Sequence, residues 1–400
     1  MPQLSSLLDR FQPSAIAQIF SHATRLRETG KELWSFSTGE PDFDTPDHIR
    51  AAAKRAIDEG DTHYTPTDGR SALKEAVQGK FQRDNDLDYS VEQIVIGMGA
   101  KPLLTNAIQA VVDQGDEVIL TTPCWPSHVG MTMMAGGQPI RIETGSETGF
   151  KMSPEMLEAV ITSRTRLVLL CSPSNPTGAV YSAQELEGLA AVFRKHPQIW
   201  ILTDDLYEHI LFDDMSFATI AQVAPDLKDR VLTVNGVSKG YAMTGWRIGY
   251  AGGPDPWIRG IQKIFSQTNG GPCSISQAAA TEALNGPQDF LRDWAQVYQS
   301  RRDLALSYLG DCPGLTCAPP AGAFYLLPNC SSLLGKTTPQ GQTLQDSSQL
   351  ADHLLNDWGI VVVPGAGFDC GPYFRISVAT SEEVIKGGLE RLVKACSSLS

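Results

Sequence analysis

RLVLLCSPSNPTG, residues 166–178, joins a run of apolar residues to a polar turn rich in Ser, Pro and Gly. The run LVLL is apolar at consecutive positions, which is typical of a strand buried on both faces in a sheet covered by helices on each side. In open α/β sheets, ligands bind beyond the carboxyl ends of the strands. The stretch therefore predicts both an α/β fold and a binding site at the turn that follows this strand.

Similar short apolar runs alternate with longer helical patterns between residues 90 and 285, for example the helical patterns at 101–112 and 183–196. This alternation indicates an α/β layer structure around a mostly parallel sheet. The other predicted strands are 93–99, 116–123, 200–206, 230–236 and 246–253.

The C-terminal part has a different pattern. Long helical stretches over 274–310 precede three strand-like runs, FYLLP (324–328), GIVVVPG (359–365) and YFRISVA (373–379), with further helical patterns between and after them. We expect a large three-layer αβα domain over 46–289 and a smaller α+β domain formed by 1–45 and 290–400. The Ser-, Gly-, Gln- and Thr-rich segment 331–349 is predicted to be an exposed loop.

Composition excludes several classes of protein. A net charge of −13 argues against nucleic acid as the main partner, because phosphate binding needs clustered Lys and Arg. Eight scattered cysteines without a CxxC pair indicate reduced thiols and a cytoplasmic protein. The start of the chain does not resemble a secretory signal, and no apolar run reaches the roughly 18 residues of a membrane span. The seven histidines have no metal-site or triad spacing and are interpreted as structural or surface residues.

The turn GMGAKP (97–102) follows one predicted strand and leads into a helix. Gly99 and Ala100 leave backbone N–H groups open for an anion such as phosphate. A plain tight turn is the alternative. Gly97-x-Gly99 also resembles the start of a dinucleotide fingerprint, which would suggest a nicotinamide oxidoreductase, but Pro102 stands at the third glycine position.

Polar residues end two neighbouring predicted strands. Asn175, in the turn quoted above, could donate a hydrogen bond to a ring oxygen or a carboxylate. Asp204 could pair with a protonated pyridine nitrogen, and Tyr207 lies three residues further on, within reach of the same ring. The alternatives are an ordinary turn and solvated strand-end acids.

Three basic residues interrupt apolar surroundings. Lys239 follows a strand in a Ser/Gly-rich loop, and Arg247 is expected to begin the next strand. A lysine and an arginine between buried strands suggest an imine-forming amine and a phosphate clamp, although a lone lysine is usually on the surface. Arg375, in YFRISVA, suggests a bidentate clamp for a substrate carboxylate, with exposure on an edge strand as the alternative.

Together these motifs resemble the class I/II aminotransferases of fold type I, in the aspartate aminotransferase branch. The resemblance spans nearly the whole chain, from STGEPDFDTP (37–46) and HYTPTDGRSALKEAV (63–77) to FRISVATSEE (374–383). Its most specific part is the order NPTG, Asp-x-x-Tyr, Ser-Lys and MTGWRIGY. The resemblance implies pyridoxal 5′-phosphate as the cofactor, bound as a Schiff base to Lys239, and ping-pong transfer of an amino group from an amino acid to a 2-oxo acid such as 2-oxoglutarate.

The resemblance also implies a role for each matching residue. Lys239, Asp204 and Tyr207 would be catalytic, with Asp204 on the pyridinium nitrogen and Lys239 moving the proton. Tyr207 and Asn175 would contact the phenolic oxygen, and Trp125 would stack on the ring unless it is simply a core aromatic. The residues expected around the phosphate are Gly99, Ala100, Lys101, Ser238, Arg247 and, from the partner of a homodimer, Tyr64. Arg375, Asn175, Trp125 and Gly39 would bind the substrate.

The chain departs from its relatives at three places. Gly236 stands where many relatives have Ser, which implies one hydroxyl fewer at the phosphate. The loop 266–277, expected to reach the partner's site, differs from the usual Ser/Thr-rich version, and Ile16 replaces a hydroxyl that some relatives place near the substrate side chain. Lys101 matches relatives in which this lysine faces the distal carboxylate of a dicarboxylic substrate. Aspartate is therefore the default donor. The alternatives are β-elimination with the same cofactor and a non-enzymatic regulator, which would need a DNA-binding domain that the residues before position 37 are too few to form.

Overall fold

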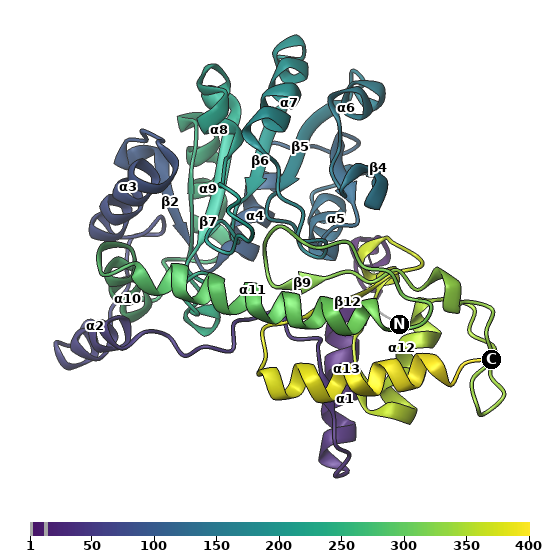
Figure 1. The fold of residues 1–400 in the computed structure, drawn as a ribbon. Helices are drawn as coiled ribbons and strands as arrows, with labels where there is room; N and C mark the ends of the chain where they lie inside the picture. The colour runs from purple at the N-terminus through teal and green to yellow at the C-terminus, as the bar shows by residue number, and fades with distance from the viewer. Residues whose placement is uncertain (1–2, 12–14) are drawn as a thin grey trace.

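The computed structural model describes residues 3–11 and 15–400, with the side chains of 15–18 left aside. Figure 1 shows an upper body, in which helices pack around a sheet, and a lower body that contains α12, α13 and the N-terminal helix α1. The long helix α11 (Asp289–Gly310) runs across both. No helix among the described residues is long and apolar enough to cross a membrane.

The upper body is built on a seven-stranded sheet in the order β2-β8-β7-β6-β5-β3-β4. All its pairings are parallel except those of β8, which is antiparallel to both neighbours. Six strands match the predicted runs. The strands are β2 (Ile94–Gly97), β3 (Glu117–Thr122), β4 (Gln138–Glu143), β5 (Thr165–Cys171), β6 (Trp200–Asp204), β7 (Val231–Gly236) and β8 (Gly249–Gly252).

The structure corrects the sequence interpretation at two strands. The edge strand β4 was not predicted, because QPIRIE contains no apolar run like those of the other strands and only Ile142 in it is buried. Arg247 does not begin a strand: it has a φ of +59° and lies two residues before β8. The preceding residues Thr244–Trp246 form a short 3-10 helix, so the arginine projects from a turn.

Helices cover both faces of this sheet, which confirms the predicted αβα layers. Alternate residues of β5 show the division, since Val168 and Leu170 belong to one apolar core and Leu167 and Leu169 to the other. The first core is covered by α2 (Asp47–Asp58), α3 (Ser71–Asn85), α6 (Pro154–Val160), α7 (Ala183–Lys195), α8 (Ile220–Val223) and α10 (Ser274–Asn285). The second is covered by α4 (Ala100–Gln109), α5 (Pro126–Met134) and α9 (Asp255–Thr268).

A further core holds the lower body together and draws on both ends of the chain. Its two small sheets pair β1 with β10, in parallel, and order β11-β12-β9, antiparallel. Phe36 from the N-terminal segment is buried in this core. The elements are α1 (Ala15–Glu28), β1 (Trp34–Ser35), β9 (Tyr325–Leu326), α12 (Ser347–Trp358), β10 (Ile360–Val361), β11 (Val363–Pro364), β12 (Phe374–Ser377) and α13 (Glu382–Ser397).

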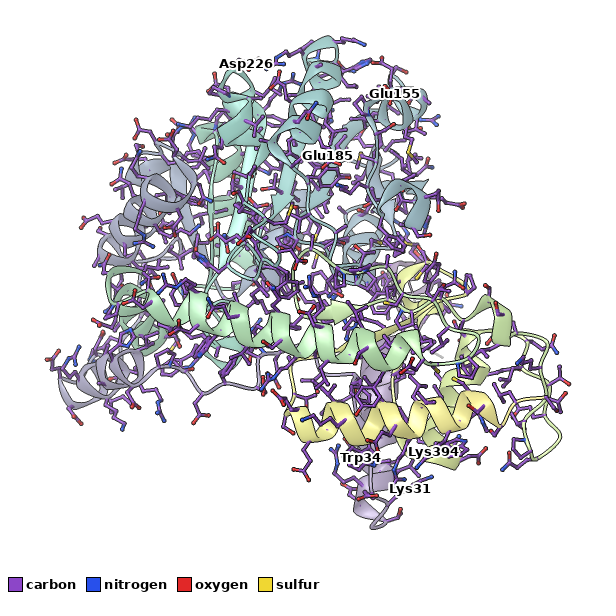
Figure 2. All side chains as sticks on the ribbon, viewed as in Figure 1. Lys31, Trp34, Glu155, Glu185, Asp226 and Lys394 are labelled. Atoms are coloured by element: carbon purple, nitrogen blue, oxygen red, sulfur yellow. The ribbon has the colours of Figure 1, made fainter. Side chains whose placement is uncertain are left out.

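This arrangement supports the division into 46–289 and 1–45 with 290–400, which we retain as a proposal. Figure 2 places Trp34 beside α13, where a Cβ on Gly387 would lie 2.3 Å from the indole ring. The labelled Glu155, Glu185 and Asp226 lie at the far end of the upper body. Segment 331–349 is largely exposed, although Leu333 and Leu344 are buried. The eight cysteines are free, and five of them are buried.

Candidate active site

A cavity of about 360 Å³ lies at the carboxyl ends of β5, β6 and β7, where the upper and lower bodies meet. It collects side chains from eight separate segments of the chain. Among the residues predicted for the site, those in its wall are Gly39, Ala100, Lys101, Trp125, Asn175, Asp204, Tyr207, Ser238, Lys239, Arg247 and Arg375. Leu104, Cys171, Leu206, Thr244 and Tyr325 complete the wall.

Asp204 is the last residue of β6, and only 6% of its surface is exposed. Its Oδ2 atom lies 2.9 Å from His128 Nε2, whereas its Oδ1 atom is buried without a hydrogen-bond partner among the described residues. A buried carboxylate oxygen with no partner is costly, so Oδ1 is suited to bind a cationic or N–H group of a ligand.

His128, interpreted from the sequence only as a structural or surface residue, contacts a residue of the cavity wall. It is fully buried on α5, and its ring holds the carboxylate that faces the cavity. Local sequence patterns do not reveal this contact, because the two residues are 76 positions apart. Asp205, the neighbouring acid, is also buried but is not in the cavity wall, and burial raises its pKa well above the ordinary value.

Lys239 lies in the loop after β7 and extends into the cavity. Its Nζ atom donates a hydrogen bond to the Gly39 carbonyl oxygen and lies 5.8 Å from the centre of the Tyr207 ring. Burial lowers the pKa of this amine to about 8; nearby Arg375 and Arg247 act in the same direction, against Glu40 and Asp204. About a tenth of the amine is therefore neutral, and hence nucleophilic, at pH 7, far more than for an ordinary lysine.

Gly99 and Arg247 meet at one end of the cavity, where α4 begins. Gly99 has a φ of +94°, and a Cβ there would lie 2.5 Å from Arg247 Nη2, so only glycine fits. The helix N-terminus, the guanidinium and the Ser238 hydroxyl together offer positive charge and hydrogen-bond donors for an anion. Lys101 is close by, and burial together with Arg247 lowers its pKa.

Three aromatic residues, Tyr207, Tyr325 and Trp125, line the cavity. The Tyr207 hydroxyl lies 2.9 Å from the Tyr325 hydroxyl, and burial raises the pKa of Tyr207 well above its ordinary value. Tyr325 was not predicted as a site residue, because nothing in FYLLP distinguishes a core tyrosine from a cavity tyrosine. Trp125 also lies in the wall. The centre of its ring is 5.2 Å from that of His128, and the two rings are perpendicular, so His128 packs against the indole.

Arg375 is 1% exposed, so it is not an exposed residue of an edge strand. Its Nη1 atom donates to Asn175 Oδ1 and its Nη2 atom to the Ser37 carbonyl oxygen, each at 3.0 Å. The guanidinium also lies 4.3 Å from the centre of the Tyr325 ring. Its Nε atom has no partner in the part of the chain that the structure describes, which leaves a donor for a carboxylate.

Gly99 borders the cavity without being part of its wall, and Tyr64 and Gly236 also lie outside the wall. Tyr64 is fully exposed and is not brought to the site by its own chain. The side chain of Ile16 is outside the described residues. At Gly236, a Cβ would lie 3.1 Å from the Ile248 carbonyl oxygen, so the turn leaves little room for the serine of many relatives.

A second cavity, of about 630 Å³, adjoins the first and shares Lys101 with it. It lies between α4, α5 and the segment 366–369 and is largely apolar, with three methionines in its wall. The charged residues in its wall are Arg10, Lys101, Arg141 and Asp369.

The smaller cavity fits pyridoxal phosphate by its chemistry. It has an anion seat at Gly99 and Arg247, an unpartnered carboxylate oxygen at Asp204, and a lysine amine of lowered pKa between them. These are the partners that the phosphate, the pyridine nitrogen and the aldehyde of this cofactor require. The fold and the site thus define the class of pyridoxal-phosphate enzymes of fold type I.

Comparison with known proteins narrows this class. The family profile described as aminotransferase class I and II matches residues 31–392. An aspartate/prephenate aminotransferase of Cereibacter sphaeroides is 49% identical over the full length of both chains. The crystal structure of the aspartate aminotransferase from Rhizobium meliloti is 48% identical, covers both chains completely and has a TM-score of 0.97. A Thermus thermophilus aspartate aminotransferase with maleate is 39% identical over 99% of this chain and 100% of that one, with a TM-score of 0.91.

The chain therefore belongs to the class I and II aminotransferases, in the aspartate aminotransferase branch. It is a pyridoxal-phosphate-dependent aminotransferase, and its substrates are amino acids and keto acids.

Proposed function

We propose that the chain transfers the amino group of aspartate, or of a related dicarboxylic amino acid, to a 2-oxo acid such as 2-oxoglutarate. The observation that carries this proposal is that Lys239, Asp204 and Arg375 face one cavity of about 360 Å³. Lys101 adds a cation at the edge of the cavity, where a second carboxylate of the substrate would lie. The relatives named as aspartate aminotransferases, and the one solved with maleate, support a dicarboxylic substrate.

The bound cofactor supplies an electron sink that stabilises the charge left when a proton leaves the substrate α-carbon. The residues of this chain do the rest. Arg375 and Asn175 would orient the α-carboxylate, and the neutral Lys239 amine would take the proton from the substrate α-carbon and hold it on Nζ. Asp204, whose Oδ2 atom contacts His128, would hold the pyridine nitrogen through its unpartnered Oδ1 atom. Tyr207, whose hydroxyl lies 2.9 Å from that of Tyr325, would donate to the phenolic oxygen of the cofactor.

A half-reaction with purified protein tests the proposal. Adding aspartate should abolish the visible absorbance of the cofactor and release one 2-oxo acid per site, and 2-oxoglutarate should then restore the absorbance. Borohydride reduction followed by peptide mass spectrometry should place the cofactor on Lys239. Failure of every amino acid to change the absorbance would rule out transamination at this site.

The acceptor can be tested in the same experiment. The name of the Cereibacter sphaeroides relative includes prephenate, so prephenate is a second acceptor to compare with 2-oxoglutarate. The β-elimination alternative has no support from the relatives, which are named as aminotransferases. Release of ammonia and pyruvate without an acceptor would favour it.

We further propose that the working unit is a homodimer in which Tyr64 reaches the phosphate of the neighbouring site. The full exposure of this tyrosine in a single chain supports the proposal. Mixing Lys239→Ala with Tyr64→Ala protein tests it, because each hybrid dimer would regain one complete site. Activity that does not exceed the sum of the two separate variants would place Tyr64 outside the partner's site.

A further inference from the structure

Behind the turn that follows β6, on the side away from the cofactor cavity, four polar side chains form a cluster: Lys80, Asn85, Glu208 and His209, called here the Lys80 cluster. Lys80 is fully buried and forms an ion pair with Glu208, whose side chain is 3% exposed. Lys80 Nζ donates to Asn85 Oδ1 at 2.7 Å, and Asn85 Nδ2 donates to Glu208 Oε2 at 2.9 Å.

Burying two charges costs free energy that their attraction offsets only when the remaining polar atoms are also bonded. Asn85 closes such a network between the two. Burial opposes the charge of Glu208, yet Lys80 holds the pKa of this carboxyl below its ordinary value, so the ion pair persists at neutral pH. This network fixes Lys80, Asn85 and Glu208 in one geometry, while His209 Nε2 has no hydrogen-bond partner among the described residues.

A metal site is the competing interpretation. Asp84, Glu208 and His209 have potential ligand atoms within 4.8 Å of one another. The ammonium of Lys80 already contacts Glu208 and lies 3.9 Å from Asp84 Oδ2. Lys80 therefore supplies the positive charge at this position, and a metal ion would first have to displace it.

The cluster is joined to the active site through the backbone. Asp204 and Tyr207 line the cofactor cavity, and Glu208 is bonded to Tyr207 by the next peptide. The turn is closed by hydrogen bonds from Glu208 N–H to the Asp205 carbonyl oxygen at 3.1 Å and from Ile210 N–H to the Tyr207 carbonyl oxygen at 2.8 Å. Anchoring Glu208 to α3 therefore fixes the position from which Tyr207 enters the cavity.

His209 joins the cluster to the lysine loop. Its Nε2 atom lies 3.2 Å from Glu208 Oε1, and burial lowers its pKa, so the ring is largely neutral near pH 7. A Cβ on Gly240 would lie 3.0 Å from His209 Cδ2, and the ring packs edge-on against Tyr241 at 5.9 Å. The imidazole thus supports the two residues that directly follow Lys239.

We propose that the Lys80 cluster positions Lys239 and Tyr207 against the cofactor. It does so by holding the turn after β6 and the loop that carries Lys239 in fixed positions relative to each other. This inference rests on the proposed role of Lys239 as the reacting amine. Loosening the cluster would let water reach that amine. Because burial is the main cause of its lowered pKa of about 8, greater hydration should raise the pKa.

Two variants loosen the cluster in different ways. Lys80→Met with Glu208→Gln removes both charges together, so neither is left buried without a partner, and the glutamine can still accept from Asn85. His209→Ala removes only the ring that supports Gly240. Glu117→Gln is the matched control, because the Glu117 side chain is likewise 3% exposed and paired with an arginine, Arg164, but lies at the opposite end of the strands.

The measurement is the pH dependence of Lys239 labelling in the full-length, cofactor-free protein, using an amine-selective reagent and peptide mass spectrometry. The rate should rise with pH through a midpoint near 8 in the unaltered protein, because only the neutral amine reacts. Both cluster variants should move the midpoint up by about one unit, a tenfold change in the protonation equilibrium. Glu117→Gln should leave it in place.

Unmoved midpoints in both cluster variants, or an equal shift in Glu117→Gln, would overturn the positioning role. If the double variant does not fold, His209→Ala decides the question alone. Failure of the proposed function looks different: borohydride would then leave the cofactor off Lys239 in the unaltered protein. A normal cofactor label with unmoved midpoints would remove only the positioning inference.

Discussion

The two adjoining cavities of this protein differ in size and in what their walls contain. The larger, about 630 Å³, is mostly apolar, and its Arg141 and Asp369 pair with each other at 2.7 Å with both side chains 40% exposed. The smaller, about 360 Å³, holds Asp204 and Arg375, both more than 90% buried, each with a polar atom that has no partner among the described residues. Buried polar atoms without a partner indicate a site of chemistry. Choosing the candidate active site by cavity volume alone would have selected the larger cavity, which lacks such atoms in Arg141 and Asp369.

Lys101 belongs to both walls. We therefore expect the residues of the smaller cavity to determine kcat. We expect Lys101 to determine which substrate side chains the enzyme prefers. Substitutions in the smaller cavity should therefore reduce activity most. Substitution of Lys101, which both walls share, should have a smaller effect, and substitutions in the wall of the larger cavity the smallest.

Lys239→Ala should have the largest effect. It removes both the amine that binds the cofactor and the base that moves the proton, so kcat should fall by about 10⁴-fold or more. Rapid measurement of the half-reaction with aspartate checks this. Lys263→Ala, an exposed lysine on α9, is the control and should keep full activity. A kcat loss below about tenfold in Lys239→Ala would remove the lysine from the mechanism.

Arg375→Leu should lower kcat/KM for aspartate by about 100-fold or more, because the substrate carboxylate loses a buried partner and Asn175 is left without its donor. Steady-state kinetics with aspartate and 2-oxoglutarate measure this effect. The control is Arg301→Leu, which removes another buried arginine, paired with Asp42 at 2.8 Å outside the cavity wall. Equal losses in the two variants would indicate general damage to the fold.

Lys101→Met should act on selectivity. We expect kcat/KM for dicarboxylic substrates to fall by about tenfold, because the variant loses one charge-assisted hydrogen bond at a partly exposed site. The kcat/KM for neutral amino acids should change little. The ratio of the two kcat/KM values is the quantity to compare. A parallel fall for both substrate classes would mean that Lys101 serves the cofactor instead of the side chain.

Arg141→Ala should have the smallest effect. The pair that it breaks with Asp369 is substantially exposed, so the free energy of unfolding should drop by about 1 kcal/mol or less. Urea unfolding measures the stability, and kcat/KM for aspartate should stay within about threefold of the unaltered value. A loss comparable to that of Arg375→Leu would extend the catalytic site into the larger cavity.

Sequence reasoning anticipated the parts of the fold that repeat a local pattern. Strands such as LVLL are apolar on both faces and lie in the middle of the sheet, so the pattern alone predicted them. The edge strand β4 contains no such apolar run and escaped detection. Arg247 was placed at the start of a strand, because a left-handed turn residue has no signature when it is not glycine or asparagine.

Among the site residues, those that end an apolar strand or stand in a family motif could be named in advance, and eleven of them line one cavity. Their roles remain predictions until the variants are measured. His128 and Tyr325 were missed because each touches its partner across more than 70 positions of sequence. The same is true of Lys80 and Glu208, which a sequence presents as two ordinary surface charges.

The sequence by itself determined the class of the fold, six of the seven strands of the large sheet, and eleven of the residues that line the cavity at its carboxyl edge. Local periodicity and strand-end chemistry carry that information in a few consecutive residues. The tertiary structure alone decided which oxygen of Asp204 is left for a ligand, that Lys239 is buried enough to lower its pKa, and that Lys80 stands behind Tyr207. Desolvation and ion pairing depend on atoms from distant segments, so they exist only once the chain has folded.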